Sequence, residues 1–474
     1  MVVHPTATLC NMQELFFRME VEENLFSMQM SDGTYFWDVI RRDVYLGLHT
    51  LHGGPFALPQ ASPAPSLASR VKDVAKPLAN AVSRRYLVAK APKYIFITAQ
   101  RLRSGATLVD NISDPLYDLL AADSVAIELM NKSAIRCRNM LTGGLTRLPP
   151  VAIRSLLADT ELEKIAQQVK QAIFRHFGLA LDIARLVADA IAMFRDTRDH
   201  YRTLFRDFRP RAIIGVNNGT LSGMYLAAKE AGVPTVELQH GASTYYTIFW
   251  SYPTSIAPSH PGLSLPTAYF TYSDYWNTNT HFPVKLFRSI GTDYFYQEPA
   301  ASVSNDVLMI SSYMYRDALL GLALELAAKD TGRTVFFKLH PHEFDKKAQV
   351  VGFCQTHQNI RIVCDELEFP ELLTLCRYVI GVQSTAIYLA LQARKHVCLL
   401  KHSNYFWHED VFKYVELFDS ADELHGLTHD GEGVHFKNHS AIPDLFQPFS
   451  EQAFVKALDD VEEAVASAAA NPIT

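Results

Sequence analysis

The sequence predicts an α/β protein in which two Rossmann-like, doubly wound domains face a cleft, with a helical extension at the amino terminus. Two stretches in which strand-like apolar runs alternate with helical runs carry this prediction, one at 211–238 and one at 307–400. The segment 242–300 between them is rich in Pro and Tyr, and we expect it to be irregular. Because 474 residues exceed what one hydrophobic core usually serves, two domains are expected.

Composition narrows the class of protein. A hydrophobic share of 48% and a charged share of 20% are those of a globular chain. With 44 Lys and Arg against 50 Asp and Glu, the net charge of −6 gives no global attraction to nucleic acid, so no nucleic-acid partner is expected. The basic stretch at 70–103 is either a solvated connection or a surface that faces a membrane or polyanion.

Six scattered cysteines without a C-x-x-C pair are typical of reduced core residues, which favours the cytoplasm. No signal peptide is apparent, and no apolar run reaches the ~18 residues of a membrane span. Near the amino terminus, Phe36, Ile40, Val44 and Leu48 can share one helical face, which we expect to be core. The Pro-, Ala- and Ser-rich stretch 53–69 is typical of a loop.

The chain divides into four parts. These are a helical segment with its Pro/Ala-rich loop at 1–70, a first Rossmann-like domain with a helical insertion at 71–290, a second Rossmann-like domain at 300–445, and a terminal helix at 446–474 that can return to the first domain.

The expected elements follow from local patterns of apolar residues. In the first domain they are a strand at 94–98, a helix opened by Asp110 and Asp114, helices within 150–208, a strand at 212–216, a helix at 221–232 and a strand at 234–238. In the second they are strands at 307–311, 335–339, 360–364, 378–382 and 397–400, with helices at 316–329, 369–376 and 385–393. Ser450 can cap the last helix.

The motif FKLHPHE lies where a strand gives way to a turn. Alternation along a strand predicts that Lys338, His340 and His342 point to one side, as a cationic cluster suited to a phosphate or carboxylate. The alternative is histidines that pack or cap a strand end. An H-x-H pair can also chelate a metal, but no third ligand stands at a recognisable spacing, so no metal is expected.

The motif GVQSTA joins a strand directly to a helix. Gln383, Ser384 and Thr385 stand at this junction, where hydroxyls and unpaired backbone N–H groups can face an anion. A plain Ser/Thr helix cap is the alternative.

The motif VELQHG ends a strand of the first domain. An acid on an interior strand is costly unless it is paired, so we expect Glu237 to face the cleft or a cation. His240 could act as an acid/base group. The preceding turn, with Asn217 and Asn218, offers amides at the same sheet edge. Phosphate-loop, dinucleotide-binding, zinc-protease and hydrolase motifs are all missing, as is any Asp-x-Asp triplet.

Four stretches of the sequence carry a family resemblance: IIGVNNGT, AGVPTVELQHG, KLHP and QSTAIYLAL. In these stretches the region 211–400 resembles the GT-B glycosyltransferases that build bacterial capsule and lipopolysaccharide chains. The nearest groups are the Kdo-transferase, polysialyltransferase and teichoic-acid polymerase-like ones. The resemblance implies a GT-B-like fold, in which the second domain binds a nucleotide sugar and the first binds a glycan or glycolipid acceptor. It implies no cofactor besides the donor substrate.

The resemblance also implies residue roles. His340 would bind the donor phosphate, with Ser384 and Thr385 as further ligands. The wider donor-binding set would be Lys338, His342, Gln383, Asn217 and Asn218. An inverting enzyme would take its base from Glu237, His240, Asp110 or Asp114; in a retaining one that role changes. CMP-linked acidic sugars are favoured over UDP- or GDP-sugars.

Two other functions remain open from the sequence. One is a metal-dependent hydrolase built on His340 and His342, and the other is a non-catalytic sugar- or nucleotide-binding protein of polysaccharide assembly. For the glycosyltransferase we expect a cytoplasmic location, with peripheral contact with the inner membrane as an open alternative.

Overall fold

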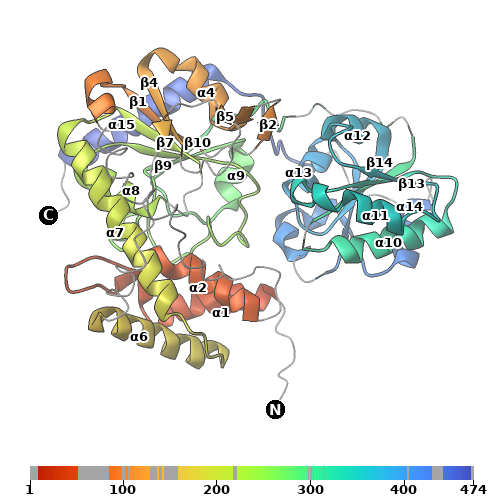
Figure 1. The fold of residues 1–474 in the computed structure, drawn as a ribbon, viewed down its shortest axis with the longest axis horizontal. Coiled ribbons are helices and arrows are strands. Elements are labelled where there is room, and N and C mark those ends of the chain that lie inside the picture. The colour runs from red at the N-terminus through yellow and green to blue at the C-terminus, as the bar shows by residue number, and fades with distance from the viewer. Residues whose placement is uncertain are drawn as a thin grey trace, which may run out of the picture.

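The computed structural model shows two parallel sheets, each in its own domain (Figure 1). It describes residues 9–51, 85–98, 102–104, 107–128, 136–137, 141–142, 159–216, 221–296, 298, 302, 304–312, 314–402, 405–429 and 441–470. The predicted loop at 53–69, part of the basic stretch at 70–103 and the turn residues Asn217 and Asn218 lie outside these ranges.

The first domain is built on a seven-stranded sheet with the order β10-β9-β8-β7-β1-β4-β6. The strands are β1 (Tyr94–Thr98), β4 (Ser124–Glu128), β6 (Leu141–Thr142), β7 (Ala212–Gly215), β8 (Thr235–Leu238), β9 (Ala268–Thr271) and β10 (Leu286–Ser289). A small sheet beside it joins β2 (Leu102–Ser104), β3 (Thr107–Val109) and β5 (Arg136–Cys137).

Helices cover both faces of this sheet, which is why its central strands are continuous apolar runs. Phe96 and Ile214 pack on the face covered by α4 (Asp114–Leu119) and α15 (Glu451–Ala470). Ile95 and Ile213 pack on the other face, under α7 (Ala184–Asp207) and α8 (Ser222–Ala231). The chain therefore returns to the first domain after completing the second, and Ser450 caps α15 by accepting the Ala453 amide at 3.2 Å.

The second domain has a six-stranded parallel sheet with the order β13-β12-β11-β14-β15-β16. Its strands are β11 (Asp306–Ile310), β12 (Val335–Lys338), β13 (Ile360–Val363), β14 (Cys376–Gly381), β15 (His396–Leu400) and β16 (Glu416–Phe418). Its helices are α10 (Arg316–Lys329), α11 (Lys347–Phe353), α12 (Phe369–Leu375), α13 (Thr385–Gln392) and α14 (Ala421–His429), with 3-10 turns η4 (Pro341–Lys346) and η5 (Tyr405–Tyr414). Helices α12 and α13 pack on one face, and α10, α11 and α14 on the other.

The two parallel, doubly wound sheets confirm the predicted fold class. One prediction was wrong: the segment 242–300 is not irregular throughout, because it contains β9, α9 (Asp274–Asn279) and β10. These strands have four residues each, and β10 ends in Arg288 and Ser289 at the edge of the sheet. The edge strand β10 is only half-buried and ends in polar residues, and β9 lies within a Pro- and Tyr-rich stretch, so neither stands out as an apolar run in the sequence.

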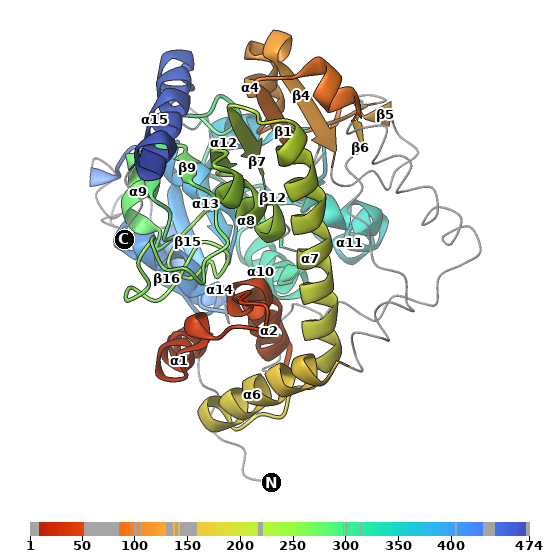
Figure 2. The same cartoon turned by 90° about the vertical axis from the view of Figure 1, so that its left-hand side faces the viewer.

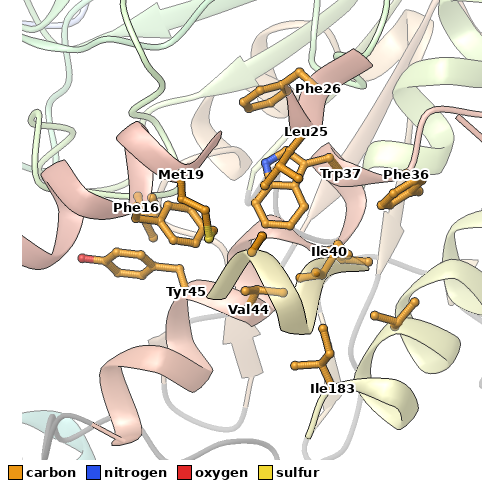
Figure 3. Close-up of a cluster of buried hydrophobic side chains, with 14 of the residues drawn as sticks. Phe16, Met19, Leu25, Phe26, Phe36, Trp37, Ile40, Val44, Tyr45 and Ile183 are labelled. Atoms are coloured by element: carbon orange, nitrogen blue, oxygen red, sulfur yellow. The ribbon is translucent and has the colours of Figure 1, made fainter. Parts of the chain in front are cut away.

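The amino-terminal helices belong to the body of the first domain. Helices α1 (Leu9–Glu22) and α2 (Trp37–Leu51) pack with α6 (Thr160–Phe177) and α7 around one aromatic core (Figure 3). Figure 2 shows α6 crossing the lower end of the long helix α7, with α1 and α2 beside them. The predicted core face is confirmed, since Phe36, Ile40, Val44 and Leu48 are all fully buried.

A buried ion pair joins α1 to α2. Arg41 Nε and Glu20 Oε1 are 2.8 Å apart, and both side chains are at most 3% exposed. Arg41 also donates to the carbonyls of Ile248 and Ser251, at 3.0 and 3.2 Å. The pair therefore ties the loop after β8 to the helices below it.

The domains share a core. Trp276 of α9 is fully buried among residues of the second domain, with its ring 4.9 Å from that of Tyr388 on α13. Its Nε1 donates to the Leu445 carbonyl at 2.6 Å. In the part of the chain that is described, no helix combines the length and the apolar character of a membrane span.

We expect Glu20→Gln to lower the free energy of unfolding by about 3–5 kcal/mol, because it removes the charged carboxylate that bonds the buried guanidinium of Arg41. The matched control is Asp43→Asn, which removes the partner of Arg42 in a more exposed pair and should cost less than about 1 kcal/mol. Urea unfolding of the two variants measures both effects. Equal losses would contradict the role given to the buried pair.

Candidate functional site

The loops that follow β8 and β14 meet between the domains. The amide of Ala242 donates to Oγ1 of Thr385 at 3.1 Å. A Cβ added at Gly241 would lie 3.3 Å from the same oxygen, so a side chain there would crowd the contact. Since both strands lie in parallel sheets, the contact joins the two carboxyl edges, where open α/β sheets bind ligands.

The second sheet reverses its winding between β11 and β14. Ser311 and Ser312, both buried, follow β11, and the predicted Gln383 and Ser384 follow β14. A crevice for ligands is expected at such a switch point. The GVQSTA motif therefore lies where topology alone would place a ligand.

His240 lies on the first domain's side of this junction. Its side chain is 17% exposed, and its Nδ1 is 3.9 Å from Oε1 of Glu237. Glu237 is fully buried and accepts the hydroxyl of Tyr225 at 2.7 Å. Burial, reinforced by the charge of Glu237, holds the pKa of Tyr225 well above its usual value, so Tyr225 stays a hydrogen-bond donor. The acid thus faces the histidine from inside the protein, and the hydrogen-bond partner of its carboxylate is the hydroxyl of Tyr225.

An aromatic ring fixes the position of His240. The ring of Trp250 lies 4.9 Å from the imidazole in an edge-to-face arrangement. Trp250 belongs to the loop whose carbonyls at Ile248 and Ser251 accept from Arg41. The buried ion pair of α1 and α2 therefore supports the histidine through this loop.

The start of α13 has the helix cap that the sequence offered as the alternative for this motif. Ser384 is the helix cap, and its Oγ accepts the Ala386 amide at 3.1 Å. The amide of Ser384 donates to Nε2 of His408 at 3.1 Å, so this N–H is not unpaired. Burial lowers the pKa of His408 to about 3, which keeps the imidazole neutral and able to accept. The sequence could not reveal this partner, because His408 lies in η5, 24 residues further along the chain.

Lys338 has a different environment from the one predicted. Its Nζ donates to the carbonyls of Cys364 and Leu367, the latter at 3.3 Å, and so ties β12 to the loop after β13. Burial lowers the pKa of Lys338. The expected alternation through 342 is not found, because β12 ends at Lys338 and the chain enters η4 at Pro341. His342 lies in η4, and its side chain is outside the described part.

His340 lies two residues after the end of β12 and is half-buried. Its backbone N–H donates to Oε2 of Glu343 at 3.0 Å, and the same oxygen accepts Oγ of Ser311 at 2.8 Å. Glu343 is 2% exposed, and its Oε1 has no hydrogen-bond partner among the described residues. Glu343 therefore links the loops after β11 and β12. Sequence reasoning missed it, although an acid directly after HPH was a visible signal.

Asp110 and Asp114 build a turn rather than an open acid/base site. Oδ1 of Asp110 accepts the amides of Ile112 and Ser113 at 3.0 and 3.1 Å, and Oδ2 of Asp114 accepts the Asp110 amide at 3.1 Å. Both carboxylates are at most 3% exposed. These bonds shape the entry into α4.

That turn lines a recess at the carboxyl ends of β8, β9 and β10. The recess holds roughly 470 Å³, counting the part open to solvent, and its lining includes Asn111, Gln239, Tyr272, Asp293 and Phe449. Gln239 immediately precedes His240, so the recess and the histidine lie on the same sheet edge.

Asp410 connects the domains beside α13. It accepts the hydroxyl of Tyr275 from α9 and, at 2.8 Å, that of Tyr388 from α13. Burial raises its pKa to about 6, against the opposing effect of the two hydroxyl groups.

No family model matches the chain, and no curated protein matches its sequence. Several solved structures are similar. They include MurG of Acinetobacter baumannii, with 9% identity and a TM-score of 0.43 over 79% of this chain and 100% of the other. The UDP-GlcNAc 2-epimerase of Neisseria meningitidis bound to UDP-GlcNAc has 14% identity and a TM-score of 0.45, covering 77% and 99%. The calicheamicin glycosyltransferase CalG4 has 12% identity and a TM-score of 0.42, covering 81% and 100%. Similarity this low carries no argument about activity.

The raised pKa of Asp410 predicts a pH effect on stability. The folded protein binds this proton more tightly than the unfolded chain, so the stabilisation from Asp410 is complete below about pH 4 and declines as the pH rises to about 6. A rise of this size corresponds to about 3 kcal/mol. Relative to the Asp410→Asn variant, the wild type should lose roughly that free energy of unfolding between pH 4 and 7. Parallel curves for the two proteins would show that the prediction is wrong.

Proposed function

We propose that this chain transfers a sugar from a nucleotide-sugar donor to a glycan acceptor. The observation that carries the proposal is the contact between the VELQHG loop and the start of α13, through Ala242 and Thr385. Through this contact His240, with Glu237 behind it, lies near the carboxyl edge of the second sheet, which suits a phosphate. Transfer needs these two functions together, a base for the acceptor and stabilisation of the leaving nucleotide.

The second domain would hold the donor. The amino terminus of α13 favours negative charge, and the hydroxyls of Ser384 and Thr385 stand at it. His340, anchored through its backbone to Glu343, would donate to the donor phosphate. Negative charge grows on that phosphate as the glycosidic bond breaks through an oxocarbenium-like state, and these donors would stabilise it.

The first domain would supply the base. With Nδ1 of His240 facing Glu237 at 3.9 Å, the other ring nitrogen is the one that would take the proton of the acceptor hydroxyl. Glu237 would then stabilise the imidazolium, as a positioning residue rather than a proton acceptor. The deprotonated oxygen attacks the anomeric carbon as the phosphate leaves, which is an inverting transfer. The recess beside Gln239 would receive part of the acceptor.

The finer assignment follows the sequence resemblance. We propose a CMP-linked acidic sugar as donor and a capsular or lipopolysaccharide glycan as acceptor, at a cytoplasmic site that can include the inner-membrane surface. UDP- and GDP-linked sugars are the alternative donors.

His240→Ala should lower kcat by at least about 100-fold, the contribution typical of a general base, with little change in KM for the donor. The control is His260→Ala, a histidine of the same domain in the loop before β9. Steady-state transfer assays measure both. Full turnover by His240→Ala would rule out the proposed base.

A second variant separates positioning from folding. Glu237→Gln can still accept from Tyr225, but it removes the charge that favours the imidazolium. The acidic limb of its pH–rate profile should therefore move to lower pH, an effect that a merely structural role would not produce.

Nucleotides that bind the folded protein should raise its melting temperature by mass action. At a nucleotide concentration of 100 times Kd, the free energy of unfolding rises by about 2.7 kcal/mol. We expect CMP to exceed UDP, CDP and GDP, and His340→Ala to weaken the effect at least about tenfold in affinity. His357→Ala, in the same domain but after α11, is the matched control. A chain that responds to none of the nucleotides would contradict the proposal, while binding without donor consumption would favour a non-catalytic binder.

A further inference from the structure

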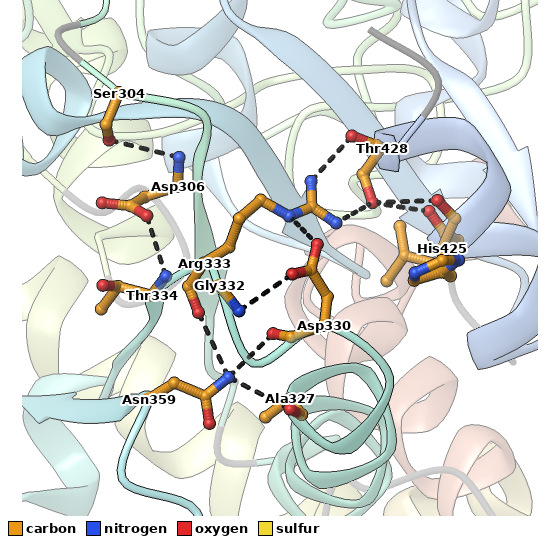
Figure 4. A network of polar contacts seen from close by, with 11 residues as sticks. Ser304, Asp306, Ala327, Asp330, Gly332, Arg333, Thr334, Asn359, His425 and Thr428 are labelled. Carbon is orange, nitrogen blue, oxygen red and sulfur yellow. Dashed lines mark hydrogen bonds and ion pairs between the residues drawn. The ribbon is translucent and has the colours of Figure 1, made fainter.

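Two histidines and an aspartate gather on the side of the second domain away from the candidate site. His425 and His429 stand one turn apart on α14, with their rings stacked 4.7 Å apart and 29° from parallel. Asp330 follows α10, and Figure 4 shows it near His425. One ligand atom from each of the three residues lies within 4.8 Å of the others. The spacing arises because residues four apart share a helix face.

Arg333 holds the aspartate in this position. Its Nε donates to Oδ2 of Asp330 at 2.5 Å, while its Nη1 and Nη2 donate to the carbonyl and hydroxyl of Thr428 at 2.7 and 3.2 Å (Figure 4). Oδ1 of Asp330 accepts the Gly332 amide at 3.1 Å. Burial opposes ionisation of Asp330, but the Arg333 bond prevails and lowers its pKa. The carboxylate is thus charged and fixed against the turn of α14 that carries the histidines.

We propose that Asp330, His425 and His429 bind a divalent transition-metal ion of the Zn²⁺ type. Two imidazole nitrogens and one carboxylate oxygen are ligands that such ions prefer, whereas Mg²⁺ and Ca²⁺ favour oxygen alone. Each carboxylate oxygen has a second lone pair beside the bond it already accepts. Small rotations of the two imidazole rings would bring the ligand atoms, which lie within 4.8 Å of one another, to the spacing that Zn²⁺ ligands require. Because His429 is exposed, water completes the coordination.

The site would join α10 to α14. The same helices are already linked by an ion pair between Lys329 and Asp422, at 2.5 Å. Asp330 and Arg333 precede β12 and so lie at its amino end, whereas His340 follows its carboxyl end. The metal would therefore stabilise the second domain without touching the transferred sugar. This inference stands independently of the proposed function.

The guanidinium of Arg333 offsets the charge of Asp330, so binding should be reversible rather than permanent. Because binding is reversible, Zn²⁺ can be removed from the purified full-length chain and added back, and the stability of the protein can be compared with and without the metal.

The test is thermal unfolding of the tag-free, chelator-stripped protein with ZnCl₂. We expect a rise of a few degrees at saturating Zn²⁺. In the double variant His425→Ala/His429→Ala the rise should be lost, and in each single variant the affinity should fall at least about tenfold. His357→Ala, which removes a histidine elsewhere in the domain, should respond like the wild type.

Co²⁺ offers a second readout, since its absorption bands report nitrogen and oxygen ligands directly. They should appear in the wild type and disappear in the double variant, which separates loss of the site from loss of the fold. An equal response to Zn²⁺ in wild type and double variant, or no response in either, would overturn the proposal.

Discussion

The insertion of Trp276 into the core of the second domain is the interaction on which the candidate site depends. Its ring is fully buried against Tyr388, and its Nε1 bonds the Leu445 carbonyl. Tyr388 belongs to α13, the helix whose first residues meet the VELQHG loop. This aromatic contact is buried, and the indole N–H has a hydrogen-bond partner, so the contact stabilises the arrangement in which the carboxyl edges of the two sheets face each other. The contact between Ala242 and Thr385 follows from that arrangement.

Positioning of His240 depends on a longer chain of contacts. The buried pair of Glu20 and Arg41 fixes the loop that carries Trp250, and Trp250 packs against the imidazole. On the other side Glu237 faces Nδ1 and is itself held by Tyr225. Two amino-terminal helices thereby support the proposed base through the loop that carries Trp250.

Local patterns in the sequence predicted most of the fold. Buried parallel strands are continuous apolar runs, and the apolar residues of a helix recur every three or four positions. The strand at 94–98 and the helix at 316–329 have the predicted bounds. The strands β9 and β10 carry too little of this signal, because they lie within a Pro- and Tyr-rich stretch and β10 ends in two polar residues. Within the site, the motifs did not reveal the hydrogen-bond partners of their residues, because these partners come from distant parts of the chain. Lys338 bonds carbonyls beyond β13, and the amide of Ser384 bonds His408. Glu343 gains its importance from Ser311, which lies 32 residues away.

Hydrogen exchange with a bound nucleotide tests the central claim most directly, that the two carboxyl edges form one site. The account predicts slower exchange after β11, β12 and β14, at 311–312, 340–343 and 383–386, together with protection at 239–242 across the domain contact. Protection confined to other regions, such as α14 or the recess beside Asn111, would contradict it.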